Sequence, residues 1–290
     1  MVASVSVVIP SHNEGTQLLA TVESVLANLP AGGEVIVVDD GSTDGSADRL
    51  EHEAVRVVQP TERLGVAAGR NFGATQARGD VLVFCDAHIR VPPDWLDRLV
   101  KVLDQPNVGA VAPAISVMGA PSGSIGYGFR WKDSALNVEW LGWQVADPYP
   151  VPLLPGCCLC IRHDVFANVG GFDNGLSVWG SEDGELCLRL WLMGYQCWLV
   201  PTLEVPHLFR TAHPYQVAWQ TIVHNLLRVG VVHFGRERLQ RMIGSLAPTA
   251  GFPGALATLV EGDAWARRAW LRERRCYDDD WFFDRFNMAW

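Results

Sequence analysis

The chain has 290 residues, of which 49% are apolar and 19% are charged. This composition supplies a sizeable core and excludes an intrinsically disordered chain. The formal net charge of -9 argues against nucleic acid as a partner, because non-specific nucleic-acid binding needs a surplus of Lys and Arg.

The start of the sequence shows no basic, cleavable leader, and no uncharged apolar run reaches the roughly 18 residues that a membrane helix needs. The seven cysteines are odd in number and stand mostly in apolar runs. We therefore expect no membrane span, a cytoplasmic location and reduced, buried thiols. The Cys157-Cys158-x-Cys160 cluster is interpreted as core, because its spacing is too tight for a zinc site.

The first 115 residues alternate strand-like and helix-like patterns. Short, β-branched apolar runs predict strands, and stretches of helical periodicity between them predict helices. The expected strands are 5–9, 35–38, 55–58, 81–84 and 109–112, and the expected helices are 16–29, about 44–53, 66–77 and 95–103. Continuous apolar strands between helices predict an α/β fold, Rossmann-like, with a mostly parallel central sheet and helices on both faces.

The later part of the chain has a different pattern. Residues 116–155 are rich in Gly, Pro and aromatic side chains, and we expect them to be irregular. A strand is expected at 158–161 and a helix at 183–193, and a helical pattern runs from Pro214 to about Leu246. The sequence therefore predicts a helical extension at its C-terminal end.

Polar clusters follow three of the expected strands. They are Pro10-Ser11-His12-Asn13-Glu14, Asp39-Asp40-Gly41-Ser42-Thr43-Asp44 and Cys85-Asp86-Ala87-His88. Each cluster alone fits an ordinary turn. Because ligands bind beyond the carboxyl ends of the strands in an open parallel sheet, the three together predict a binding site.

Asp86 and His88 are candidate metal ligands. In an extended segment, residues two apart point the same way, so the two side chains can converge on one ion. His207 is the candidate third ligand, with a core histidine as the alternative interpretation. Mixed oxygen and nitrogen ligands favour Mn²⁺, with Mg²⁺ as the alternative, and a single carboxylate leaves positions for a diphosphate.

The sequence contains neither of the two standard glycine-rich phosphate-binding motifs. A diphosphate would have to be neutralised by the metal and by side chains. Arg70 is a candidate for this task, and its alternative is a solvated helix face. Glu182 and Asp183 stand at or just before a helix N-terminus, where the helix dipole favours ionised carboxylates. Such a carboxylate can act as a general base, with helix capping alone as the alternative.

Segments 7–14 and 37–44 resemble the nucleotide-binding half of the GT-A nucleotide-sugar glycosyltransferases, in particular the glycosyltransferase family 2 superfamily. Asp86-Ala87-His88 is similar to the Asp-x-His motif of the polypeptide N-acetylgalactosaminyltransferases. Segment 178–194 and positions 201–210 are similar to the same group. The resemblance covers about residues 4 to 210.

The resemblance implies a role for each matching residue. Asp40 would bind the uracil edge, and the turn from Pro10 through His12 to Glu14 would cradle the nucleoside. The other implied positions are Asp86, His88 and His207 for Mn²⁺ against the diphosphate, with Gly156, Trp179 and Glu182 lining the sugar and acceptor pocket.

The residue after Glu182 separates two family patterns. The retaining N-acetylgalactosaminyltransferases usually have Glu-Asn there, whereas Glu-Asp is the inverting family 2 pattern, in which the Asp is the catalytic base. We therefore expect a metal-dependent, inverting transfer from a UDP-sugar, with Asp183 as the general base beside Glu182. Retaining transfer is the alternative. The sequence does not indicate whether the acceptor is a peptide, a glycan, a lipid carrier or a small molecule. It does not indicate the oligomeric state either.

Two other classes of protein share such a nucleotide-binding half. A sugar nucleotidyltransferase normally has a glycine-rich, basic loop after its first strand, and residues 11–15 lack any Lys or Arg. A non-catalytic nucleotide-sugar-binding module would tolerate loss of the predicted ligands and base, all of which are present. Both classes are therefore weaker alternatives.

The resemblance also implies a domain organisation. We expect a GT-A catalytic domain at 1–210, with a nucleotide-binding half at 1–115 and an acceptor-binding half at 116–210. Residues 211–290 form the helical, aromatic-rich extension, which either packs over the catalytic core or serves as a lid or acceptor platform. In the second case, Trp281, Phe282, Phe283 and Trp290 would close over the site or meet a partner subunit.

Overall fold

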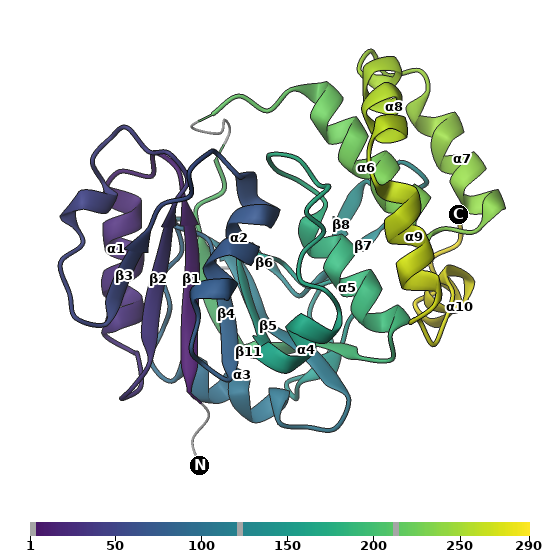
Figure 1. Ribbon diagram of the computed structural model, residues 1–290. Coiled ribbons are helices and arrows are strands. Elements are labelled where there is room, and N and C mark those ends of the chain that lie inside the picture. The colour runs from purple at the N-terminus through teal and green to yellow at the C-terminus, as the bar shows by residue number, and fades with distance from the viewer. Residues whose placement is uncertain (1–3, 121–123, 211–214) are drawn as a thin grey trace.

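The computed structural model describes residues 4–120, 124–210 and 215–290 (Figure 1). Within these ranges a central sheet has the strand order β3-β2-β1-β4-β10-β5-β11-β9, with β6 paired to β5. Its strands are β1 (Val5–Ser11), β2 (Glu34–Asp39), β3 (Val55–Val58), β4 (Val81–Cys85), β5 (Val108–Val117), β6 (Ile125–Gly126), β9 (Tyr149–Pro150), β10 (Cys158–Arg162) and β11 (Gln196–His207). A separate pair comprises β7 (Phe129–Trp131) and β8 (Val138–Trp140).

The helices are α1 (Thr16–Leu26), α2 (Gly65–Gln76), α3 (Trp95–Leu103), α4 (His163–Asn168), α5 (Glu182–Leu192), α6 (Trp219–His233), α7 (Arg236–Leu246), α8 (Phe252–Glu261), α9 (Ala264–Arg272) and α10 (Asp279–Arg285). The pairs β1–β2, β2–β3, β1–β4 and β5–β11 are parallel, and β10 runs antiparallel to both of its neighbours. The expected mostly parallel sheet is therefore confirmed.

The alternation of side chains along the strands fills two cores, one on each face of the sheet. In β1, Val7 and Ile9 join the core that α1 and α3 cover, whereas Val8 joins the core that contains α2, α4 and α5. Both faces of the strands are apolar because both are covered, which is why these strands read as continuous apolar runs. The expected helices on both faces are present.

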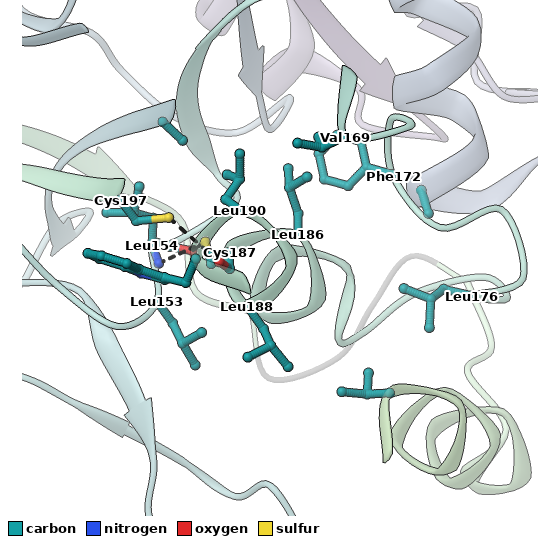
Figure 2. Close-up of a cluster of buried hydrophobic side chains, with 14 of the residues drawn as sticks. Leu153, Leu154, Val169, Phe172, Leu176, Leu186, Cys187, Leu188, Leu190 and Cys197 are labelled. Carbon is teal, nitrogen blue, oxygen red and sulfur yellow. Dashed lines mark hydrogen bonds between the residues drawn. The ribbon is translucent and has the colours of Figure 1, made fainter. Parts of the chain in front are cut away.

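Helix α5 is a core helix and carries the Glu182-Asp183 pair in its first turn. Leu186 and Leu190 lie on one side of the helix and Leu188 on the opposite side, and all three are buried (Figure 2). The Cys187 sulfur accepts a hydrogen bond from the Leu154 N–H at 3.2 Å. Because α5 is buried on all sides, with Glu185 and Arg189 paired to each other inside, its first turn has a rigid support.

The C-terminal helices gather at one end of the sheet, beside α5 (green to yellow in Figure 1). Buried polar contacts between side chains join them to the rest of the protein. Arg228 of α6 makes two hydrogen bonds to Asp173, at 2.8 and 2.7 Å, and His233 Nε2 lies 2.8 Å from Glu185 of α5.

The four aromatic side chains of the C-terminal extension that were candidates for a lid, Trp281, Phe282, Phe283 and Trp290, pack within the protein and do not form a lid over the cavity. Phe282 and Phe283 are buried, Phe283 stacks on Trp131, and Trp290 packs edge-on against Phe283. Trp281 packs against Trp191. None of these four tail aromatics lines the large cavity described below.

Several sequence expectations are wrong in detail. Only a single 3-10 turn at Ala47–Arg49 occurs where a helix reaching Glu53 was expected. The helical pattern ending at Leu246 is two helices, separated at Phe234 and Gly235. Its expected start at Pro214 lies outside the described residues, and so do residues 1–3. The described part of 116–155 contains four two- or three-residue strands, which are too short to give a periodic signal.

All seven cysteines are free, and six are buried as expected, but Cys276 is exposed because it follows α9 at the surface. No helix in the described ranges has the length and apolar character needed to cross a membrane. The expected cytoplasmic location stays a prediction.

Candidate functional site

The polar segments that follow β1, β2 and β4 line one cavity, as expected for the carboxyl ends of parallel strands. The cavity has a volume of about 510 Å³. The end of β11, the segment around Gly156 and the first turn of α5 complete its wall. All of the site residues predicted from the sequence line this cavity: Pro10, His12, Glu14, Asp40, Arg70, Asp86, His88, Gly156, Trp179, Glu182, Asp183 and His207.

Asp86, His88 and His207 form a cluster that could hold a metal ion. One potential ligand atom of each lies within 4.8 Å of the others. His207 reaches the cluster because the end of β11 pairs with the segment after β4: His207 bridges to Ile89, and the Leu208 N–H donates to the His88 carbonyl at 3.1 Å. His207 lines the cavity, so the alternative interpretation of His207 as a core histidine is wrong.

The donor atoms fit a divalent ion. His207 Nε2 lies 3.3 Å from Asp86 Oδ2, while its Nδ1 is buried without a hydrogen-bond partner among the described residues. Burial raises the pKa of Asp86, but the hydrogen bond to His207 and the positive charge of Arg70 outweigh this and hold the pKa below its usual range. An ionised carboxylate with two imidazoles is a donor set suited to Mn²⁺.

Arg70 is the buried cation of the site. Its Nη2 atom donates to Asp86 Oδ1 and to the Gly156 carbonyl, both at 2.9 Å, and its Nη1 lies 3.6 Å from Glu182 Oε1. The side chain is only 2% exposed, so a solvated helix face is wrong as an account of Arg70. Its Nη1 and Nε atoms have no hydrogen-bond partner among the described residues. The positive charge of a guanidinium in the cavity wall favours an anionic ligand nearby.

The Glu182-Asp183 pair differs from the expectation that the helix dipole keeps both carboxylates ionised. Burial, with the nearby charge of Asp183, raises the pKa of Glu182 to about 7. Burial also raises the pKa of Asp183. Removal from water thus opposes the charged forms more strongly than the helix N-terminus and Arg70 favour them, so the helix dipole does not by itself set the charge of the pair.

Both oxygens of Asp183 are engaged by the backbone. Oδ1 accepts from the Gly184 N–H at 2.7 Å, and Oδ2 accepts from the Gly156 N–H at 3.2 Å. Asp183 thus holds the segment around Gly156 against α5. That close approach requires glycine, because a Cβ atom at position 156 would lie 2.9 Å from Asp183 Cβ and 3.0 Å from Arg70 Nη1.

The loops that follow β1 and β2 contact each other and the start of α2. His12 Nδ1 lies 2.8 Å from the Asp40 carbonyl. The Asp40 carboxylate accepts hydrogen bonds from the N–H groups of Leu64 and Gly65 at 2.6 and 2.9 Å, which places it at the start of α2. Glu14 faces His88 and Arg210.

An aromatic wall forms the outer part of the cavity. It comprises Phe129, Trp140, Trp179 and Phe209, of which Trp140, Trp179 and Phe209 are 40% to 45% exposed. Phe209 packs edge-on against both His207 and Trp140. The cavity therefore has a polar, metal-competent interior and an apolar outer part.

Several residues that line the cavity were not identified from the sequence. Cys157, interpreted only as core, lines the cavity next to Gly156, and Arg63 and Tyr215 reach it from loops. Cys157 directly follows Gly156, a predicted site residue, and this position could have indicated that Cys157 lines the cavity. Nothing in the local pattern marks Arg63 or Tyr215.

Comparison with known proteins then decides the family. The model of "Glycosyl transferase family 2" matches residues 6–170, which is more than half of the chain. This chain belongs to glycosyltransferase family 2. A second model, "N-terminal domain of galactosyltransferase", matches residues 144–214 of this family 2 protein.

Relatives of this glycosyltransferase family 2 chain include polypeptide N-acetylgalactosaminyltransferase 11 of Xenopus tropicalis, which is 30% identical over 96% of this chain and 49% of its own length. Polypeptide N-acetylgalactosaminyltransferase 8 of Drosophila melanogaster is 36% identical over 71% of this chain and 38% of its own length. The chain thus spans about half or less of the length of these relatives.

Solved structures agree with the expected GT-A fold. A crystal structure of GalNAc-T7 with UDP, GalNAc and Mn²⁺ superposes with a TM-score of 0.84 at 25% identity, over 98% of this chain and 56% of that one. The mannosyltransferase PcManGT of Pyrobaculum calidifontis, with GDP-Man and Mn²⁺, shares the fold at a TM-score of 0.58 and 22% identity, over 99% of this chain and 84% of that one. The GT-A architecture and the family 2 resemblance are confirmed.

Proposed function

We propose that this chain is a Mn²⁺-dependent glycosyltransferase that moves N-acetylgalactosamine from UDP-GalNAc to a hydroxyl group of a polypeptide, with retention of configuration. The observation that carries the proposal is the convergence of Asp86, His88 and His207 in the cavity that Arg70 also lines. The relatives named polypeptide N-acetylgalactosaminyltransferases, and the structure with UDP, GalNAc and Mn²⁺, support the donor and the acceptor.

In this proposal Asp86, His88 and His207 hold the ion. A divalent ion supplies charge stabilisation to the departing diphosphate, so no general acid is needed there. Arg70, whose side chain is buried in the cavity wall beside Asp86, adds a second positive charge. The aromatic wall would hold the acceptor, because large rings bind an apolar or extended polypeptide segment at low entropic cost.

Retention takes the place of the inverting mechanism expected from the Glu182-Asp183 pattern. An inverting base must take the acceptor's proton while the acceptor attacks the sugar opposite the leaving group. Asp183 is poorly suited to this, because both of its oxygens already accept backbone hydrogen bonds. In retaining transfer, the acceptor oxygen bonds to C1 on the face that the diphosphate leaves, so the departing phosphate oxygen can itself take the proton.

The test is direct product analysis. The protein is incubated with Mn²⁺, UDP-GalNAc and a peptide containing Ser and Thr, and the anomeric proton of the new glycoside is observed by NMR as it forms. The proposal predicts an α-linked sugar, the configuration of the donor. A β-linked product would restore the inverting mechanism, and transfer from another UDP-sugar alone would replace the donor assignment.

A further inference from the structure

Glu14 is a buried carboxylate that lies between a candidate metal ligand and an arginine. It lies three residues after the end of β1, and its side chain is 7% exposed. Its Oε2 atom lies 3.2 Å from His88 Nδ1 and 2.5 Å from Arg210 Nη2, and its Oε1 accepts from Arg210 Nη1 at 3.1 Å. One carboxylate therefore joins the segments that follow β1, β4 and β11.

The contact to His88 fixes which ring nitrogen can bind a metal. A neutral imidazole carries a proton on one nitrogen and a lone pair on the other, and only the lone pair binds an ion. A carboxylate that accepts from Nδ1 keeps the proton there and leaves Nε2 as the ligand atom. The same hydrogen bond also restricts rotation of the His88 ring.

The contact to Arg210 keeps Glu14 out of the ligand set. Both oxygens accept from the guanidinium in a two-point pair, which neutralises the charge and occupies lone pairs that an ion would need. In agreement with this, the candidate metal cluster found in the described part of the chain contains Asp86, His88 and His207 but not Glu14.

We propose that Glu14 is a positioning residue for the divalent ion, which orients His88 through Nδ1 while Arg210 holds the carboxylate outside the ion's coordination sphere. The inference rests on the proposed function, which supplies the ion. It assigns Glu14 a role different from the nucleoside-cradling role expected from the sequence.

The experiment measures Mn²⁺ binding to the nucleotide-free protein, by titration with electron paramagnetic resonance detection of free Mn²⁺. Glu14→Gln keeps the size of the side chain, removes its charge and leaves one acceptor oxygen where two now serve His88 and Arg210. Mutation of the group that orients a metal ligand costs about 10- to 100-fold in metal affinity, so we expect the Kd for Mn²⁺ to rise by that factor. No sugar nucleotide is present, so the readout does not depend on transfer.

Glu34→Gln is the matched control. Glu34 is also a carboxylate that holds an arginine, Arg56, at 2.9 Å, but it stands at the opposite end of β2 from the cavity. We expect its Kd for Mn²⁺ to equal that of the wild type. An unchanged Kd in Glu14→Gln, or an equal loss in Glu34→Gln, would overturn the assignment of Glu14 while leaving the proposed function intact. A wild-type protein that binds no Mn²⁺ would overturn both.

Arg210→Gln separates the two contacts of Glu14. It frees the carboxylate next to the site, so we expect Mn²⁺ affinity not to fall. A loss as large as that of Glu14→Gln would overturn the part assigned to Arg210.

A measurement on the wild type keeps the proposal testable should Glu14→Gln not fold. Nitrogen-15 NMR of the metal-free, histidine-labelled protein reports which ring nitrogen is protonated, with the His88 signal identified by its absence in His88→Ala. We expect the proton on Nδ1. A proton on Nε2 would contradict the proposed orientation.

Discussion

The Asp183 carboxylate and the backbone N–H of Gly156 form a hydrogen bond of 3.2 Å that joins the first turn of α5 to the segment before β10. This contact gives Asp183 a structural task at the place where the sequence pattern indicated a base. It also brings the Gly156 carbonyl within 2.9 Å of Arg70, so the two groups share one corner of the cavity.

Asp183→Asn tests which task Asp183 performs. An amide can still accept one of the two backbone hydrogen bonds, so we expect UDP binding to be retained and transfer to fall by about tenfold or less, the cost of one hydrogen bond of about 1 kcal/mol. Initial rates and UDP titrations of the same preparation measure both. A loss of transfer of a thousandfold or more with normal UDP binding would mean that Asp183 is a general base.

Gly156→Ala tests the close approach at the same corner. The added Cβ would lie 2.9 Å from Asp183 Cβ, so α5 and the Gly156 segment must separate. Overpacking of this kind costs about 1 to 3 kcal/mol, and we expect a lower Tm and weaker UDP binding. Gly244→Ala is the control, because a Cβ there meets nothing within 4 Å and lies in helix α7. Its Tm should be unchanged or higher, and equal behaviour of the two variants would contradict the packing argument.

Glu182 should make the stability of the metal-free protein depend on pH. Its pKa is raised from 4.5 to about 7, chiefly by burial, so between these values the folded protein binds more protons than the unfolded chain. Stability from this group is present below the lower value and is lost as the pH rises through the higher one. We expect Glu182→Gln to reduce the fall in Tm across that range in EDTA. Parallel Tm curves for the two proteins would contradict the raised pKa.

Arg228→Met tests how the C-terminal helices are held. Removing the arginine leaves Asp173 buried without its partner, and such losses cost about 3 to 5 kcal/mol. Urea unfolding measures the change. Arg274→Met, which removes an exposed pair with Glu273, should change stability by about 1 kcal/mol or less. A loss in Arg228→Met no larger than that of the control would show that the Arg228–Asp173 pair does not hold α6.

The sequence was sufficient for strands β1 to β5 and β10 and for the pair Asp86 and His88, because these depend on local periodicity, but it did not predict β11. His207 is 121 residues from Asp86 and was a candidate that only the family resemblance favoured over a core histidine, since its position depends on the pairing of β11 with the segment after β4. The raised pKa of Glu182 depends on burial by surrounding elements, which a local pattern does not reveal. The contacts of Glu14 to His88 and Arg210 likewise arise only when three strand ends meet.

The most direct test of the central claim is isothermal titration of the protein with UDP, in Mn²⁺ and in EDTA, for the wild type and for Asp86→Ala. The account predicts that UDP binds the wild type in Mn²⁺, that EDTA abolishes this binding, and that Asp86→Ala loses the metal-dependent part. Equal UDP affinity in Mn²⁺ and EDTA, or an Asp86→Ala variant with unchanged Mn²⁺-dependent affinity, would contradict the metal-dependent donor site.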